Sequence, residues 1–511
     1  MAGAGLLYFR VDAPGVPAGT PLPGMSMPNR STRHMPPTDR YRRSPLDLDL
    51  DTMQRLGRSV ADLVAEHLAT LREQPVLDAI DRATAERLIA TPPPAQGADF
   101  DALLATLRER IFVHAAREPH PGFIAYVPSC PTFPAVLGDW LATGFNFFAG
   151  VWAVASGPNE VELLVLDWFR QWLGMPEGSG GLLTSGGSNA NFTAVVAARH
   201  EATLDDPARI ARLTLYMSSQ THSSAIRAAW MAGIPRDNVR LIAVDADHRI
   251  ELDELAAAIA ADRAAGLVPL MVVGNGGTTN TGAVDPLREL AELCGTEQLW
   301  LHVDAAYGGF GILCERGRRA LTGIELADSV TMDPHKWLYV PFECGCIIAR
   351  EPRRLAAAFS IYPDYLKDVE SAGTEVNFAD YGEQLTRRAR GIKIWLSVCY
   401  YGVDALSEAI AYSMELASHA ERFVREESML EVLSPATLGI LCFRAHPHDV
   451  TDSTELDSLN ERIANEINAS GRWLISTTRI DGALSLRICP IGFRSTIDDM
   501  RELVRAIADM R

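Results

Sequence analysis

One lysine stands in an apolar stretch of the chain, in the sequence TMDPHKWLYVPF at residues 331–342. Of the 47 lysines and arginines, three are lysines, Lys336, Lys367 and Lys393, and the other 44 are arginines. An unpaired ammonium is unfavourable to bury. Desolvation lowers the pKa of a lysine, however, and makes its amine a nucleophile, which an arginine cannot become. A GC-rich coding bias explains the scarcity of lysine, whereas the apolar setting of Lys336 predicts an amine that attacks a carbonyl.

Two polar segments follow predicted buried strands. After GGLLT comes SGGSNANFTAVVAAR, a glycine-rich turn that opens a helix, in which Gly187 allows close approach and Ser188 offers a hydroxyl. Free N–H groups at a helix N-terminus suit a phosphate, although a simple tight turn has the same pattern. After LWLHV comes Asp304, a strand-end carboxylate that would either pair with a protonated pyridine nitrogen or cap the next turn.

Two other strand ends carry polar side chains. His222 follows LTLYMSSQ at a predicted helix start, and Thr278 follows MVVGNGG, where it would bond a ligand or cap a turn. Each feature alone has a structural explanation, but a phosphate cradle, a strand-end carboxylate and a lysine in this chain order predict a site for pyridoxal 5′-phosphate. Lys336 would hold the cofactor's aldehyde as a Schiff base, and Asp304 would keep its ring nitrogen protonated.

The elements that must position these residues alternate between short apolar runs and helical segments from residue 133 to 400. This pattern predicts a large α/β domain with a mostly parallel sheet, whose strand carboxyl ends carry the ligand site. Residues 1–45 are rich in proline, glycine, serine and arginine and are expected to form a flexible tail. Residues 46–132 predict a helical arm, and residues 401–511 predict a smaller α+β domain.

The composition excludes several classes of protein. The net charge of −18 opposes binding to nucleic acid or to anionic membranes. No continuous apolar stretch of about 18 residues predicts a membrane span, and the N-terminus lacks the basic flank of a signal peptide. The eight cysteines are scattered without a CxxC spacing, which predicts a reducing, cytoplasmic setting and no metal site.

Several motifs together resemble the group II pyridoxal-phosphate-dependent amino-acid decarboxylases, especially the aromatic L-amino-acid decarboxylases. HVDAAYGG and PHKW are similar to the two most specific motifs of that family, and HPGFIAYVPS, DWFRQWLGMP and YLKD strengthen the match. The resemblance extends from about residue 46 to the end. It implies an aspartate-aminotransferase-like domain of fold type I, and a homodimer with its active sites at the subunit interface.

The resemblance also implies roles for individual residues. His222 matches the histidine that stacks on the cofactor ring, and Ala306 lies near the other face of the ring. Gly187 and Ser188 match phosphate-binding positions, and His335 sits beside the Schiff-base lysine.

Other matched positions concern the substrate. Tyr365 in YPDYLKD matches the proton-donating tyrosine of a mobile loop, expected at about residues 360–377. Arg487 in SLRICP resembles an arginine near the substrate carboxylate, and Phe148 and Ser129 match residues with which the partner chain lines the side-chain pocket. Asp333 departs from the family, which usually has asparagine before PHKW. Because a carboxylate repels a phosphate, we expect Asp333 to bond elsewhere or the phosphate to be reached differently.

The expected activity is the decarboxylation of an aromatic L-amino acid to its amine, with Tyr365 donating the proton to Cα, directly or through His222. An aldehyde synthase of the same fold is the nearest alternative, and the resemblance implies that phenylalanine at the position of Tyr365 favours it. A decarboxylase of aliphatic or acidic amino acids is a second alternative. An acidic substrate would need an extra cation in the pocket, whereas FNFFAG at 145–150 is mostly apolar. A catalytically inactive binding protein of this fold is a third.

Overall fold

The computed structural model describes residues 44, 46–204, 206–361 and 374–510. Two units are distinguished, Met1–Ala61 and Asp62–Arg511. Helix α1 (Leu50–Ala69) begins in the first unit, and its start is capped by the Asp49 side chain, which accepts from the Thr52 N–H at 2.7 Å. Helices α2 (Arg82–Ile89) and α3 (Phe100–Thr106) follow in the second unit, each with an aspartate as N-cap. These helices lie in the segment predicted as a helical arm.

A seven-stranded sheet forms the centre of the second unit, with the order β1-β7-β6-β5-β4-β2-β3. Its strands are β1 (Gly180–Thr184), β2 (Leu213–Ser218), β3 (Val239–Ile242), β4 (Val268–Asn275), β5 (Trp300–Asp304), β6 (Ser329–Met332) and β7 (Gly345–Ala349). Neighbours from β6 to β3 pair in parallel, and β7 runs antiparallel to both of its neighbours. The mostly parallel sheet is therefore confirmed, with one reversed strand that the apolar pattern does not reveal.

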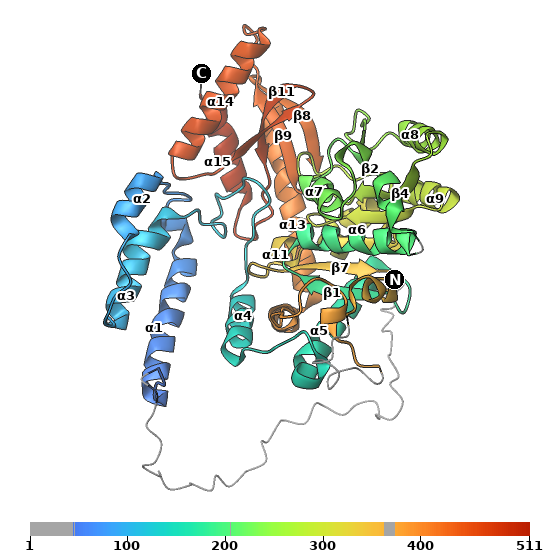
Figure 1. Cartoon of the computed structure of the whole chain (residues 1–511). Coiled ribbons are helices and arrows are strands. Elements are labelled where there is room, and N and C mark those ends of the chain that lie inside the picture. The colour runs from blue at the N-terminus through green and yellow to red at the C-terminus, as the bar shows by residue number, and fades with distance from the viewer. Residues whose placement is uncertain (1–43, 45, 205, 362–373, 511) are drawn as a thin grey trace, which may run out of the picture. The chain divides into compact units, whose positions relative to one another are not determined.

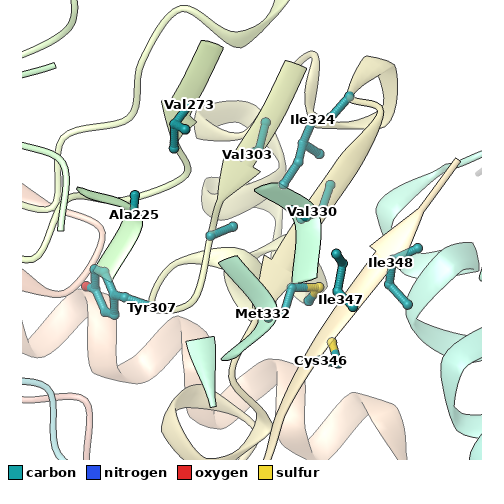
Figure 2. Close-up of a cluster of buried hydrophobic side chains, with 14 of the residues drawn as sticks. Ala225, Val273, Val303, Tyr307, Ile324, Val330, Met332, Cys346, Ile347 and Ile348 are labelled. Carbon is teal, nitrogen blue, oxygen red and sulfur yellow. The ribbon is translucent and has the colours of Figure 1, made fainter. Parts of the chain in front are cut away.

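The strands are apolar because helices cover the sheet. Figure 2 shows Val273, Val303 and Val330 on the adjacent strands β4, β5 and β6, with Ile347 and Ile348 on β7. All five side chains are completely buried. Burial on both faces explains why these strands are continuous hydrophobic runs rather than alternating ones.

Helices before, between and after the strands complete this region (Figure 1). They are α4 (Phe133–Phe145), α5 (Trp152–Leu173), α6 (Gly187–Thr203), α7 (Ser223–Met231), α8 (Leu252–Ala264), α9 (Leu287–Glu297), α10 (Glu315–Ala320), α11 (Pro334–Trp337) and α12 (Arg353–Phe359). Helix α6 packs against β1, β5, β6 and β7, so its N-terminus lies beside the strand ends where the site was predicted. None of the helices in the described residues is long and apolar enough to cross a membrane.

A second, antiparallel sheet follows the long helix α13 (Gly391–Glu426), with the order β10-β11-β9-β8. Its strands are β8 (Leu430–Thr437), β9 (Ile440–Ala445), β10 (Ser476–Ile480) and β11 (Ala483–Ile488), accompanied by α14 (Ser453–Ala469) and α15 (Ile497–Ala508) (Figure 1). Helix α13 is interrupted at Gly402, whose φ of 79° lies in the left-handed region that glycine adopts readily. This break lies close to the predicted boundary at residues 400–401, and the division into domains stays a prediction.

Lys393 is completely buried in α13, and its ammonium binds the backbone of the segment that follows α11. Its Nζ donates to the carbonyls of Pro341 at 2.9 Å and Glu343 at 3.2 Å, and it pairs with Asp139 Oδ1 at 3.0 Å. A buried ammonium with all of these acceptors is a structural cation. Since Glu343 borders the cavity described below, Lys393 supports the site indirectly.

We expect Lys393→Met to lower the free energy of unfolding by about 3 kcal/mol, because buried acceptors lose their only ammonium partner. Arg388→Met is a matched control, since Arg388 contacts the same Asp139 at 3.1 Å from an exposed position. Its loss should change stability by about 0–1 kcal/mol. Denaturant unfolding of both variants measures the difference, and equal effects would contradict a structural role for the buried lysine.

Candidate active site

A cavity of about 340 Å³ opens where the parallel strands end. Ser185 follows β1, Asn275 ends β4, Asp304 ends β5 and Asp333 follows β6, and all four residues line it. The complete lining consists of Ser185, Gly186, Gly187, Ser188, Asn189, His222, Ser224, Asn275, Gly277, Thr278, Thr279, Asp304, Ala306, Tyr307, Asp333, His335, Lys336 and Glu343. The carboxyl-end edge of an open sheet is where ligands bind in α/β folds.

Lys336 is presented to the cavity by the single-turn helix α11. The next residue, Trp337, is completely buried, donates through its indole N–H to Ser413 Oγ at 2.9 Å, and stacks on Tyr307 with ring centroids 5.1 Å apart. This anchor leaves the neighbouring Lys336 facing the cavity, with its Nζ 2.9 Å from Asp333 Oδ2. The lysine is therefore paired within its own turn rather than isolated in an apolar setting.

Asp304 ends strand β5 as an almost completely buried carboxylate. Its Oδ2 accepts from Asn191 Nδ2 at 2.8 Å, and its Oδ1 accepts from the backbone N–H of Ala306 at 3.2 Å. Both donors are neutral, so they orient the carboxylate without neutralising it. A protonated ring nitrogen in the cavity would provide the missing positive charge.

His222 is the N-cap of helix α7, where its Nδ1 accepts from the Ser224 N–H at 3.3 Å and lies 2.7 Å from Ser224 Oγ. Burial lowers the pKa of His222, and the nearby Asp304 opposes this shift only in part. The imidazole is therefore neutral at pH 7. A neutral ring at the cavity wall can stack on a flat ligand without repelling a cationic one.

The N-terminus of α6 forms the part of the cavity suited to an anion. Gly187 and Ser188 are its first residues, and the first N–H groups of a helix have no intrahelical partner. A Cβ added at Gly187 would lie 2.9 Å from the Ala306 Cβ and 3.1 Å from Asp333 Oδ2. Glycine at this position therefore allows the start of α6 to lie this close to Ala306 and Asp333.

Comparison with known proteins identifies this arrangement. A family model described as the pyridoxal-dependent decarboxylase conserved domain matches residues 84–446. The chain is also 37% identical over 463 residues to an aromatic-L-amino-acid decarboxylase of Bacillus atrophaeus, covering 90% of this chain and 96% of that relative. The chain belongs to the pyridoxal-dependent decarboxylase family. The decarboxylase is thus an enzyme that uses pyridoxal 5′-phosphate to act on amino acids.

Other relatives of the decarboxylase show the range of reactions found in proteins like it. A phenylacetaldehyde synthase of Arabidopsis thaliana is 30% identical over 455 residues, covering 87% of this chain and 92% of the relative. The crystal structure of Oryza sativa TDC with PLP and tryptamine superposes with a TM-score of 0.87 at 29% identity, covering 92% of this chain and all of that one. The predicted fold type I is confirmed.

The residues of the cavity fit pyridoxal 5′-phosphate. The helix N-terminus at Gly187 and Ser188 suits a phosphate, and Asp304 suits a protonated ring nitrogen. Lys336 supplies the amine for the aldehyde. All nine predicted cofactor-binding residues line this one cavity, namely Gly187, Ser188, His222, Thr278, Asp304, Ala306, Asp333, His335 and Lys336. Their individual roles remain predictions.

Asp333, the departure from the family pattern, directs one oxygen to Lys336 and leaves the other without a hydrogen-bond partner among the described residues. The Nε2 of His335 lies 3.6 Å from the same oxygen of Asp333. Its Nδ1 accepts from the backbone N–H of Cys344 at 3.1 Å, and burial lowers its pKa. The expectation that Asp333 bonds to something other than phosphate agrees with its contact to Lys336.

Three predicted substrate residues do not line the cavity of the described chain. Arg487, on β11, donates to the carbonyls of Thr279 and Tyr126, each at 2.6 Å, and so binds the segment that carries the cavity residue Thr279. Phe148 and Ser129 do not line this cavity, and their role is still a prediction. Tyr365 lies outside the described residues.

Two buried polar residues beside Asp304 have no predicted role, Asn191 and His302. His302 comes two residues before Asp304 on β5, and the alternation of side chains along a strand places both on the same face. Asn191 lies one helical turn after Gly187 and therefore on the same side of α6. Both positions could have been identified from spacing alone, although their mutual contact could not.

His302 should make the stability of the decarboxylase depend on pH. Complete burial lowers its pKa from 6.5 to about 4. Above pH 6.5 neither state binds a proton there. As the pH falls towards about 4, only the unfolded state takes one up, so stability is lost in this window and no further below it.

We therefore expect the free energy of unfolding of the wild type to fall relative to His302→Gln by about 1 kcal/mol between about pH 7.5 and about pH 5.8. Denaturant unfolding of both proteins at the two pH values gives the difference in their free energies of unfolding. The contributions of the other titrating groups are common to both proteins and cancel in this difference. A constant difference would show that His302 titrates normally in the folded protein.

Proposed function

We propose that this decarboxylase removes CO2 from an aromatic L-amino acid and releases the corresponding amine. The observation that carries the proposal is the meeting of Lys336, Asp304 and His222 at one cavity, from α11, β5 and the start of α7. These residues are far apart in the chain and have no common structural task. Each suits a different part of the cofactor.

Bound pyridoxal 5′-phosphate supplies an electron-withdrawing ring that accepts the bonding electrons as CO2 leaves Cα. Asp304, oriented by its two neutral donors, would hold the proton on the ring nitrogen and so keep the ring electron-poor. Lys336 would hold the cofactor through its amine, and Gly187 and Ser188 would bind its phosphate. His222, neutral because burial lowers its pKa, would lie against the ring.

Tyr365 is proposed to protonate Cα, which gives the amine rather than the aldehyde. The family resemblance supports this assignment, since phenylalanine at this position favours aldehyde formation. We expect Tyr365→Phe to lower amine formation about 10²-fold and to raise the share of aldehyde, ammonia and peroxide. Quantifying all four products tests this, and an unchanged amine yield would eliminate Tyr365 as the donor.

An aromatic substrate is supported by the relatives, which include the Bacillus atrophaeus aromatic-L-amino-acid decarboxylase and Oryza sativa TDC with tryptamine. No arginine is among the described residues that line the cavity, which is unfavourable for an acidic side chain. A panel of aromatic, aliphatic and acidic amino acids, assayed by release of CO2 and amine, tests the proposal. Turnover of glutamate or aspartate in preference to tryptophan, tyrosine, phenylalanine and DOPA would overturn it.

We also propose that the enzyme is a cytoplasmic homodimer with active sites at the interface. Large apolar side chains are exposed on α4, Trp140, Leu141 and Phe145, as expected of a surface that another subunit covers. All eight cysteines are unpaired thiols, which suits a reducing compartment. Sedimentation equilibrium should give about twice the chain mass of 55.7 kDa, and a monomer that retains full activity would contradict the dimer.

A further inference from the structure

A buried chain of polar groups leads from strand β5 to Asn191. The indole N–H of Trp300 donates to Ser329 Oγ at 2.8 Å, and Ser329 Oγ lies 2.7 Å from His302 Nδ1. His302 Nε2 is 3.0 Å from Asn191 Oδ1. His302 and Ser329 are completely buried, and Asn191 is 1% exposed. Water therefore cannot replace the partners in these hydrogen bonds, and the position of each proton is set by the protein groups themselves.

Asn191 then branches to two residues of the active site. Its Nδ2 donates to Asp304 Oδ2 at 2.8 Å and to Ser224 Oγ at 3.0 Å. Ser224 Oγ lies 2.7 Å from His222 Nδ1. One amide group therefore contacts the carboxylate for the ring nitrogen and, through a hydroxyl, the histidine at the cavity wall.

Simple donor and acceptor chemistry gives every bond in this chain a direction. A carboxylate can only accept, so the Asn191 amide directs Nδ2 to Asp304 and its carbonyl to His302 Nε2. Neutral His302 therefore carries its proton on Nε2, where Thr331 Oγ1 is a second neighbour at 3.3 Å, and its Nδ1 can only accept. The Ser329 hydroxyl, which accepts from the Trp300 indole, donates to that Nδ1.

The second branch follows the same rule. Because Ser224 Oγ accepts from Asn191, its own hydrogen is available for His222 Nδ1, which also accepts the Ser224 N–H. His222 Nδ1 is thus an acceptor on both counts. The proton of the neutral imidazole must be on Nε2.

We propose that Asn191 is a positioning residue that fixes the carboxylate of Asp304 and the Nε2–H tautomer of His222 together, and that His302 locks the amide of Asn191 in the required orientation. If His302 no longer donates, the Asn191 carbonyl loses a hydrogen-bond donor, and only the bonds to Asp304 and Ser224 hold the amide. Asn191 then fixes both of these groups less firmly. This proposal rests on the function proposed above, in which Asp304 holds the proton on the ring nitrogen.

Two substitutions at position 302 separate the hydrogen bond to Asn191 from the other contacts of His302. The amide of His302→Gln reaches the place of Nε2 and can still donate to Asn191, whereas that of His302→Asn reaches only the place of Nδ1 and can still bond to Ser329. Both variants lose the imidazole, and the asparagine variant leaves the larger space because its side chain is one methylene shorter. We expect His302→Gln to resemble the wild type and His302→Asn to lose function, with thermal unfolding confirming that both fold.

Cofactor binding provides a readout that a general loss of stability would not change. The affinity of each apoenzyme is measured for pyridoxal 5′-phosphate and for its 1-deaza analogue, in which carbon replaces the ring nitrogen. The wild type should prefer the natural cofactor, because only that cofactor can pair with Asp304. We expect His302→Asn and Asn191→Ala to reduce this preference about 10-fold. The fall in kcat should be larger than the change in KM.

Ser224→Ala tests the second branch separately. It should keep the preference for the natural cofactor, because the bond from Asn191 to Asp304 remains, and should lower kcat about 10-fold by releasing the tautomer of His222. A wild type that binds both cofactors equally would refute the proposed role of Asp304 itself. A wild type with a strong preference that His302→Asn and Asn191→Ala both retain would refute only the positioning role.

Discussion

Lys336→Ala is expected to lower kcat by about 10³-fold or more and to abolish covalent attachment of the cofactor. The reason is the ε-amine, which faces the cavity from α11 and is the only lysine amine among the described residues that line it. Lys393, the other lysine in the described residues, is buried and fully engaged with backbone carbonyls and Asp139. Borohydride treatment followed by peptide mass analysis should locate the cofactor on the peptide with Lys336 in the wild type and on no peptide of the variant.

Lys336→Arg is the control for charge. An arginine can keep the ion pair with Asp333, which the lysine makes at 2.9 Å, but it does not deprotonate and cannot condense with an aldehyde. We expect the same loss of activity and of covalent attachment as in the alanine variant. Substantial turnover by Lys336→Arg would mean that the residue acts only as a cation, and the assigned role of the amine would be wrong.

Asp304→Asn is expected to lower kcat about 10²–10³-fold and to weaken cofactor binding, with a smaller change in KM. The substitution keeps the size of the side chain and an oxygen that can accept from Asn191 or Ala306, and it removes the negative charge. The ring nitrogen then loses its proton at neutral pH and the ring withdraws electrons less strongly. Steady-state kinetics and absorbance titration of the cofactor measure the two effects.

Asp328→Asn is a matched control in the same sheet. Asp328 precedes β6 at the opposite end of the strands, where its Oδ2 accepts from the Leu301 N–H at 2.9 Å, and it does not line the cavity. We expect its loss to reduce stability and to leave kcat and cofactor affinity within about 2-fold. If both aspartate variants behaved alike, the effect at Asp304 would be attributed to folding rather than to charge at the ring nitrogen.

The class of fold and the residues of the cofactor site could be predicted because they depend on local patterns. Runs such as LTLYMS and LWLHV are buried on both faces, so they are apolar throughout and identify parallel strands. Parallel strands direct their carboxyl ends to one edge, and the residue after each run is placed there by chain direction alone. Position after an apolar run predicts that Asp304, Thr278 and Gly187 belong to one site, and all three line one cavity.

The tertiary structure decided which polar groups contact each other. Lys336 is a lysine in an apolar sequence, yet it pairs with Asp333, the N-cap of α11, which the apolar pattern does not predict. The guanidinium of Arg487 binds the backbone of Thr279 and Tyr126 from β11, contacts that the sequence does not reveal, and its role near the substrate stays a prediction. The reversed direction of β7 was equally hidden, because a buried strand has the same apolar composition in either direction.

The sequence by itself therefore determined the chemistry that is available at this site: an amine, a carboxylate, an imidazole and a helix N-terminus at the ends of parallel strands. Only the tertiary structure determined the hydrogen-bond partners, such as Asn191 with His302 across 111 residues of chain. The physical reason is the separation along the chain of the residues that interact. Strand and helix periodicity arise from neighbouring residues, whereas the direction of a buried hydrogen bond depends on donors and acceptors that folding brings together from distant segments.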